Sequence, residues 1–221
     1  MKNKYVKRSK ISEAKFRKII MYFALELDSQ KIATLTSLNR NTVNRYLNRI
    51  RSQIVSLCED QASKIPHYAT GRQVKPVLDP SLPVAPDSLP VFGIQSRNTH
   101  IYTEILPNGV HHKLRHLIKN SQKSETLSVP KDWRHYDGIV DLKSRWHYCI
   151  RPASASKRAA SELQDTIEAF LGFARKRLTT INLNGVDHIN LLLKECEFRF
   201  NHRNDNIYRL LLHRFRTDPL S

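Results

Sequence analysis

The chain has 221 residues, a formal net charge of +17 and an isoelectric point near 10.0. This length allows one hydrophobic core with a smaller module beside it, and the charge makes nucleic acid the expected partner. Apolar runs are too short to span a membrane and no signal peptide opens the sequence, which excludes a membrane partner and predicts a cytoplasmic protein.

Residues 1–58 concentrate positive charge and are predicted to form three helices. They contain thirteen Lys and Arg residues against three acids. Ser12 is a suitable helix N-cap, and apolar residues follow it at helical spacing as far as Leu27. A short helix over 29–36 and a longer one over 40–58 follow, with a turn at 37–39 between them.

The two later helices have the spacing of a helix-turn-helix. Ala33 is small enough for a close crossing, Leu38 fills the turn and Val43 anchors the second helix to the first. The exposed side of the second helix would carry side chains suited to bases and phosphates: Arg40, Asn41, Thr42, Asn44, Arg45, Asn48 and Arg49. The alternative is a plain three-helix bundle whose polar residues face water, but the concentrated charge favours DNA.

The composition of the chain changes at residue 59, where the helical pattern of apolar residues ends. Residues 59–88 are rich in proline and form either a linker or a degenerate first strand, in which Asp79 ends a short apolar stretch. Further elements are then predicted in chain order: a hairpin of strands 89–95 and 100–106, a helix over 110–120, a strand over 125–129, a turn over 131–138 that leads into a helix, and a strand over 145–150. This order indicates a mixed α/β domain over 89–221.

The last quarter of the chain begins with an amphipathic helix over 166–178 that ends in basic residues. Asp165 and Glu168 lie three residues apart on one face of it, an arrangement that can hold a divalent metal. A polar turn and a long helical run containing residues 194–203 follow. Its aromatic residues are expected to pack, whereas four polar residues would bind the sheet edge or DNA phosphates: Arg199, Asn201, His202 and Arg203.

Several stretches together resemble a known family. The most specific is Leu-Lys-Glu-Cys-Glu-Phe-Arg-Phe-Asn-His-Arg at 193–203, continuing through 207–211. Supporting stretches lie at 90–93, 101–107, 133–142, 173–178 and, in the predicted helix-turn-helix, 38–46. The chain thereby resembles small bacterial insertion-sequence transposases with a ribonuclease H-like DDE domain, in particular the ISXO-like group. That resemblance implies a helix-turn-helix followed by a ribonuclease H-like mixed-sheet domain.

The resemblance also implies a metal-dependent reaction on DNA and a location in the cell. Acidic side chains would hold two Mg²⁺ or Mn²⁺ ions, which activate water or a DNA 3′-hydroxyl against a phosphodiester at terminal inverted repeats. The acids carried over are Asp79, Asp132, Asp165 and Glu168, with Arg175, Lys176 and Arg203 as further DNA contacts. The protein would act as a homo-oligomer on double-stranded DNA in the bacterial nucleoid.

Two functions stay open because the second acid departs from the family pattern. Where the family has an Asp-Gly-Trp step, this chain has Lys131-Asp132-Trp133, so without a gap Lys131 replaces the acid. Either Asp132 serves instead and the protein is an active transposase, or it is a catalytically inactive, transposase-derived DNA-binding protein, such as a repressor or accessory factor. An RNA-binding protein is disfavoured, since it would leave the helix-turn-helix unexplained.

Overall fold

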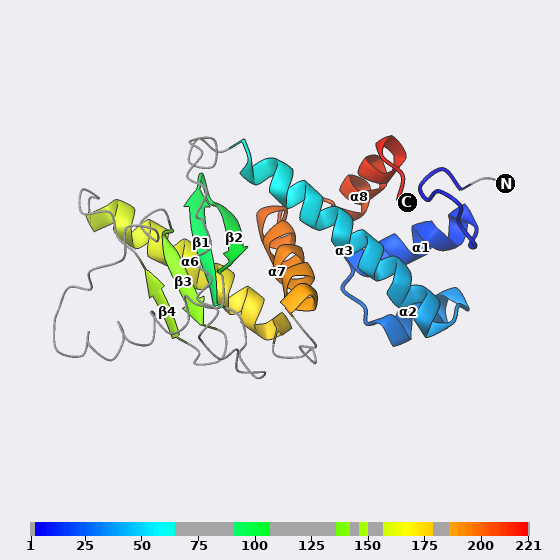
Figure 1. Ribbon diagram of the computed structural model, residues 1–221, viewed down its shortest axis with the longest axis horizontal. Helices are drawn as coiled ribbons and strands as arrows, with labels where there is room; N and C mark the ends of the chain where they lie inside the picture. The colour runs from blue at the N-terminus through cyan, green and yellow to red at the C-terminus, as the bar shows by residue number, and fades with distance from the viewer. Residues whose placement is uncertain are drawn as a thin grey trace, which may run out of the picture. The chain divides into compact units, whose positions relative to one another are not determined.

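The computed structural model describes six stretches of the chain: residues 3–64, 91–106, 136–141, 146–149, 157–178 and 186–220. They form a mixed α/β structure with six helices and four strands in the described part, as the sequence predicts in outline (Figure 1). The chain divides into two compact units: unit 1 is residues 1–58 with 202–221, and unit 2 is residues 59–201. The elements predicted at 74–79, 110–120 and 125–129 lie outside the described residues.

The first helices of unit 1 are those predicted: α1 (Glu13–Ala24), α2 (Ser29–Thr36) and α3 (Arg40–Ala62), whose last turn continues into unit 2. Ser12 Oγ accepts the N–H of Lys15 at 3.3 Å and so caps α1. Asp28 Oδ1 accepts the N–H of Lys31 at 2.8 Å, which caps α2 and lowers the pKa of Asp28. Ser37 has φ 51° in the left-handed region, which lets the chain turn sharply into α3.

A fourth helix, α8 (Ile207–Thr217), completes the core of unit 1. Leu211 and Phe215 are fully buried. The ring of Phe215 lies 6.1 Å from that of Phe16 on α1, and Phe16 in turn lies 5.8 Å from Tyr46 on α3. The sequence placed residues 202–221 in the domain of the sheet, whereas the structure groups them with the N-terminal helices, because the apolar face of α8 packs on α1.

The sheet of unit 2 has the order β2-β1-β3-β4 and antiparallel pairing throughout the described strands: β1 (Val91–Arg97), β2 (His100–Ile105), β3 (Gly138–Asp141) and β4 (Trp146–Cys149). The predicted hairpin is confirmed as β1 and β2. Asn98 and Thr99 form its turn with φ 51° and 66°, the positive values that a two-residue hairpin turn requires. The strand predicted over 145–150 is confirmed as β4.

Two predictions about the sheet differ from what the structure describes. Residues 131–138 were expected to form a turn leading into a helix. Residues 131–135 lie outside the described residues, and where the helix was expected Gly138–Asp141 is strand β3, which pairs with β1. This expectation was wrong because the pairing partner of β3 lies far away in the sequence. A mixed sheet was also expected, and each ladder between described strands is antiparallel.

Two helices pack on the sheet of unit 2: α6 (Lys157–Leu178) and α7 (Val186–Asn201). Helix α6 begins at Lys157 rather than at 166 and crosses one face of the sheet (Figure 1). The shared core joins Phe92 and Ile94 of β1 to Ile167 and Phe170 of α6 and to Leu193 of α7. Among the described residues, no helix is both long and apolar enough to cross a membrane.

Replacing Phe215 with Ala should destabilise unit 1 by about 3 to 5 kcal/mol, because it leaves a cavity against Phe16. Leu210→Ala on the same helix is the control, since Leu210 is 37% exposed and its loss should cost under about 0.5 kcal/mol. Hydrogen exchange of the α1 and α3 amides measures the difference. Equal protection in the two variants would show that α8 is not part of this core.

Candidate nucleic-acid interface and acidic residues

The N-terminal half of α3 presents the predicted polar residues on the outer side of unit 1. Arg40, Asn41, Arg45 and Asn48 are exposed, whereas Thr42, Asn44 and Arg49 are half-buried. The opposite side of the helix is buried and comprises Val43, Leu47, Ile50 and Ile54. This separation leaves cationic and amide side chains available to a partner, and their binding to DNA stays a prediction.

Local contacts fix the beginning of α3 and the direction of its cations. Asn39 Oδ1 accepts the N–H of Asn41 at 2.8 Å, which satisfies a donor of the first turn. The guanidinium carbons of Arg45 and Arg49 lie 5.6 Å and 5.9 Å from the ring centroid of Tyr46, within reach of a cation–π interaction. The Tyr46 hydroxyl lies 3.3 Å from Ser9 Oγ. Tyr46 therefore links the arginines of α3 to the segment before α1.

The predicted acids are only partly within the described structure. Asp165 and Glu168 are exposed on α6, and Glu168 Oε1 accepts a hydrogen bond from Gln164 Nε2 at 2.8 Å. Asp79 and Asp132 lie outside the described residues. In the part of the chain that is described, no group of three or more His, Cys, Asp and Glu side chains is placed to hold a metal ion. The four-acid site therefore stays a prediction.

The remaining predicted DNA contacts lie at the ends of two helices. Arg175 and Lys176 belong to the last turns of α6, and their side chains lie outside the description. Arg203 is exposed in the turn that separates α7 from α8. The long helical run that was predicted to contain residues 194–203 is thus two helices. In the turn between them, His202 Nδ1 lies 2.7 Å from Asp205 Oδ2.

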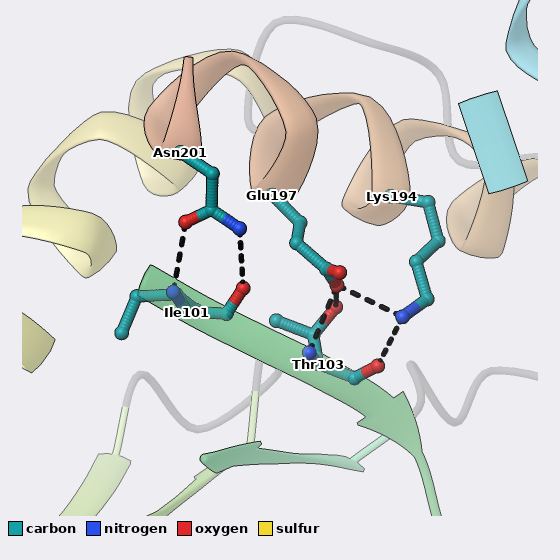
Figure 2. Close-up of polar contacts among 5 residues, drawn as sticks. All are labelled: Ile101, Thr103, Lys194, Glu197 and Asn201. Carbon is teal, nitrogen blue, oxygen red and sulfur yellow. Dashed lines mark hydrogen bonds and ion pairs between the residues drawn. The ribbon is translucent and has the colours of Figure 1, made fainter. Parts of the chain in front are cut away.

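Helix α7 binds the outer edge of β2 through polar side chains on one face (Figure 2). Asn201 Oδ1 accepts the N–H of Ile101 at 2.8 Å, and Asn201 Nδ2 donates to the Ile101 carbonyl at 2.7 Å. One amide side chain thereby satisfies both backbone groups of Ile101. Of the two roles that the sequence left open for Asn201, binding the sheet edge or DNA phosphates, the structure shows the first.

One turn earlier on α7, two buried charges bind the next outward-facing residue of β2. Glu197 Oε2 accepts from the backbone N–H of Thr103 at 2.9 Å, from Thr103 Oγ1 at 2.7 Å and from Lys194 Nζ at 2.8 Å. Lys194 Nζ also donates to the Thr103 carbonyl at 2.5 Å. The side chains of Lys194 and Glu197 are 8% and 0% exposed. We call Lys194, Glu197 and Asn201 with their partners Ile101 and Thr103 the edge clamp.

A second buried ion pair lies on α7 beside the edge clamp. Arg199 Nε donates to Glu195 Oε1 at 2.8 Å, and both side chains are less than 10% exposed. Cys196, one residue along from Glu195, is a buried free cysteine, and so is Cys58. The most specific stretch of the sequence is therefore mostly interior, and its buried charged residues are paired with one another.

Comparison with known proteins gives one informative similarity. The chain is 28% identical over 101 residues to a protein of Haemophilus influenzae described as an uncharacterized transposase-like protein. The aligned part covers 46% of this chain and 80% of that protein. No protein-family model matches the chain. No solved structure matches it either.

The edge clamp predicts a clear order of mutational effects. Asn201→Ala leaves both backbone groups of Ile101 without their partner and should cost about 1 to 3 kcal/mol. Lys194→Met leaves Glu197 as an uncompensated buried charge and should cost more, about 3 to 5 kcal/mol. The double variant Lys194→Met/Glu197→Leu should recover part of that loss, because no buried charge is then unpaired.

The measurement is denaturant unfolding combined with hydrogen exchange at the Ile101 and Thr103 amides. Asn204→Ala is the matched control, because Asn204 is exposed in the turn after α7. An Asn201→Ala variant as stable as this control would contradict a stabilising role for the clamp.

Proposed function

We propose that this chain is a transposase-related DNA-binding protein that recognises duplex DNA through α3. The observation that carries the proposal is the row of exposed Arg and Asn side chains on α3, which follows α2 across the sharp turn at Ser37. The net charge of +17 and the similarity to the transposase-like protein support it. In this proposal α2 and α3 are a helix-turn-helix, and α3 enters the major groove.

The chemistry of the α3 side chains suits such a role. Arg45 can donate two hydrogen bonds to a guanine edge, and Asn48 can pair with an adenine edge. Arg40 and Arg49 would neutralise flanking phosphates. The cation–π contacts with Tyr46 restrict the motion of Arg45 and Arg49, which lowers the entropy lost when they bind.

We further propose that unit 2 is a ribonuclease H-like domain that cleaves and joins DNA at terminal inverted repeats. Asp79, Asp132, Asp165 and Glu168 would hold the divalent ions, which stabilise charge on the attacking and leaving oxygens. Asp165 and Glu168 fit this role in being exposed carboxylates on one face of α6. Arg175 and Lys176, near the end of the same helix, would bind the DNA backbone, and the protein would act as an oligomer that brings two DNA ends together.

The second candidate is a catalytically inactive relative that binds the same DNA as a repressor or accessory factor. Lys131 favours it, because a lysine at the position of the second acid would repel Mg²⁺. Both candidates require DNA binding, and they differ only in whether the bound DNA is cut.

DNA recognition by α3 is tested with DNA duplexes that the purified protein selects from a library of random sequences. Arg45→Ala and Asn48→Ala should each weaken binding by about 1 to 3 kcal/mol and relax the base preference at one position. Arg158→Ala and Asn204→Ala remove exposed residues of the same two types from other elements and should change little. Fluorescence anisotropy at fixed salt measures the affinities. Equal losses in all four variants would argue against α3 as the recognition helix.

Catalysis is tested on DNA that carries the terminal repeats flanking the gene. With Mg²⁺ or Mn²⁺, the active form should nick this DNA, and Glu168→Ala or Asp132→Ala should reduce the rate at least about 100-fold while binding persists. Glu162→Ala is the matched control, since Glu162 is another exposed acid on α6. Tight binding without nicking by the parent protein would select the inactive candidate.

A further inference from the structure

A short basic segment before α1 is held in a defined conformation on the surface of unit 1. It comprises Lys7, Arg8, Ser9 and Lys10, and we call it the basic turn. Its three cationic residues are exposed, and no described acidic side chain pairs with any of them. The nearest ion pair along the chain joins Lys4 to Glu13 at 3.2 Å. The basic turn therefore offers three uncompensated positive charges.

Hydrogen bonds within the segment fix the shape of the basic turn. Arg8 has φ 50°, in the left-handed region, so the chain bends at this residue. Ser9 Oγ donates to the Ile11 carbonyl at 2.9 Å and lies 3.3 Å from Asn3 Nδ2. Asn3 is itself buried, and its Oδ1 accepts the N–H of Tyr5 at 3.0 Å. Such a turn presents its cations without a large loss of entropy on binding.

Two contacts from distant parts of the sequence hold the basic turn in place. On one side, Lys7 N–H donates to the Leu220 carbonyl at 2.7 Å, and Leu220 N–H donates to the Tyr5 carbonyl at 3.0 Å. On the other side, Ser9 Oγ lies 3.3 Å from the hydroxyl of Tyr46, whose ring is next to Arg45 and Arg49. Through Ser9 the basic turn thus contacts the residue of α3 whose ring lies next to Arg45 and Arg49, inside one compact unit.

We propose that the basic turn binds DNA phosphates beside the site read by α3, and that Leu220 holds it there. This inference rests on the proposed DNA binding by α3 and extends it to a second contact surface. Lys and Arg side chains bind phosphates without regard to base sequence, so the basic turn would add affinity and fix the register of α3 on the duplex.

The test compares the salt dependence of DNA binding in two charge-matched variants. Lys7→Gln/Arg8→Asn/Lys10→Gln removes the cations, and Asn is chosen at Arg8 because it tolerates positive φ. Lys18→Gln/Lys64→Gln/Arg158→Gln removes three exposed cations from other elements. Because each phosphate contact contributes about 0.9 to the slope of log affinity against log salt, the first variant should lower this slope by about 2 to 3, and the second should leave it unchanged.

The outcomes separate this inference from the proposed function. If the parent binds DNA through α3 and the two triple variants have equal slopes, the basic turn makes no phosphate contact and the inference fails alone. If the parent binds no DNA, the proposed function fails and this inference fails with it. A deletion of residues 218–221 provides a second measurement: it keeps all three cations, and it should weaken binding several-fold at fixed salt because the basic turn loses its contact with Leu220. Unchanged hydrogen exchange in α3 would show that unit 1 remains folded in each variant.

Discussion

The structure of unit 2 depends on hydrogen-bond partners for the backbone groups at the outer edge of β2. A strand at the edge of a sheet leaves every second residue with an unpaired N–H and C=O, here Ile101 and Thr103. Helix α7 supplies the missing partners with side chains. Residues two apart on a strand are separated by about 6.8 Å, and residues four apart on a helix by about 6 Å. Asn201 can therefore bind the backbone of Ile101 while Glu197, one turn earlier on the helix, binds that of Thr103. With these groups occupied, β2 cannot pair with a further strand.

The edge clamp also explains why charged residues occur in a buried helix. Glu197 loses water on burial, and its Oε2 is compensated by Thr103 and Lys194, whereas Oε1 is buried without a hydrogen-bond partner among the described residues. The backbone N–H and C=O groups of Ile101 and Thr103 each have a partner in the same cluster. A periodicity analysis of this stretch identifies its aromatic residues as core but gives no reason for the lysine and glutamate. The reason becomes visible only when the strand that they bind is in place.

The sequence predicted the features whose contacts join residues close together in the chain, and it did not predict those whose contacts join distant residues. The cap at Ser12, the bounds of α2 and the hairpin turn at Asn98 depend on neighbouring residues, and these were predicted from the sequence. Strand β3 and the place of α8 depend on partners distant in the sequence, so local patterns could not give them. The outer face of α3 followed from helical periodicity, whereas a metal site depends on which strand ends meet. The basic turn was visible as charge, but its contacts with Leu220 and Tyr46 were not.

Unit 1 is assembled from two separated parts of the chain, with all of unit 2 between them. During synthesis, α1, α2 and α3 leave the ribosome well before α8, so Phe16 has no partner in Phe215 until α8 has been synthesised. We therefore expect the core of unit 1 to be completed only after the strands of unit 2 have been synthesised. An interrupted polypeptide would carry the positive charge of the N-terminal helices without the core that orients it. Under the proposal that α3 recognises duplex DNA, such a fragment would bind DNA weakly and with little sequence preference.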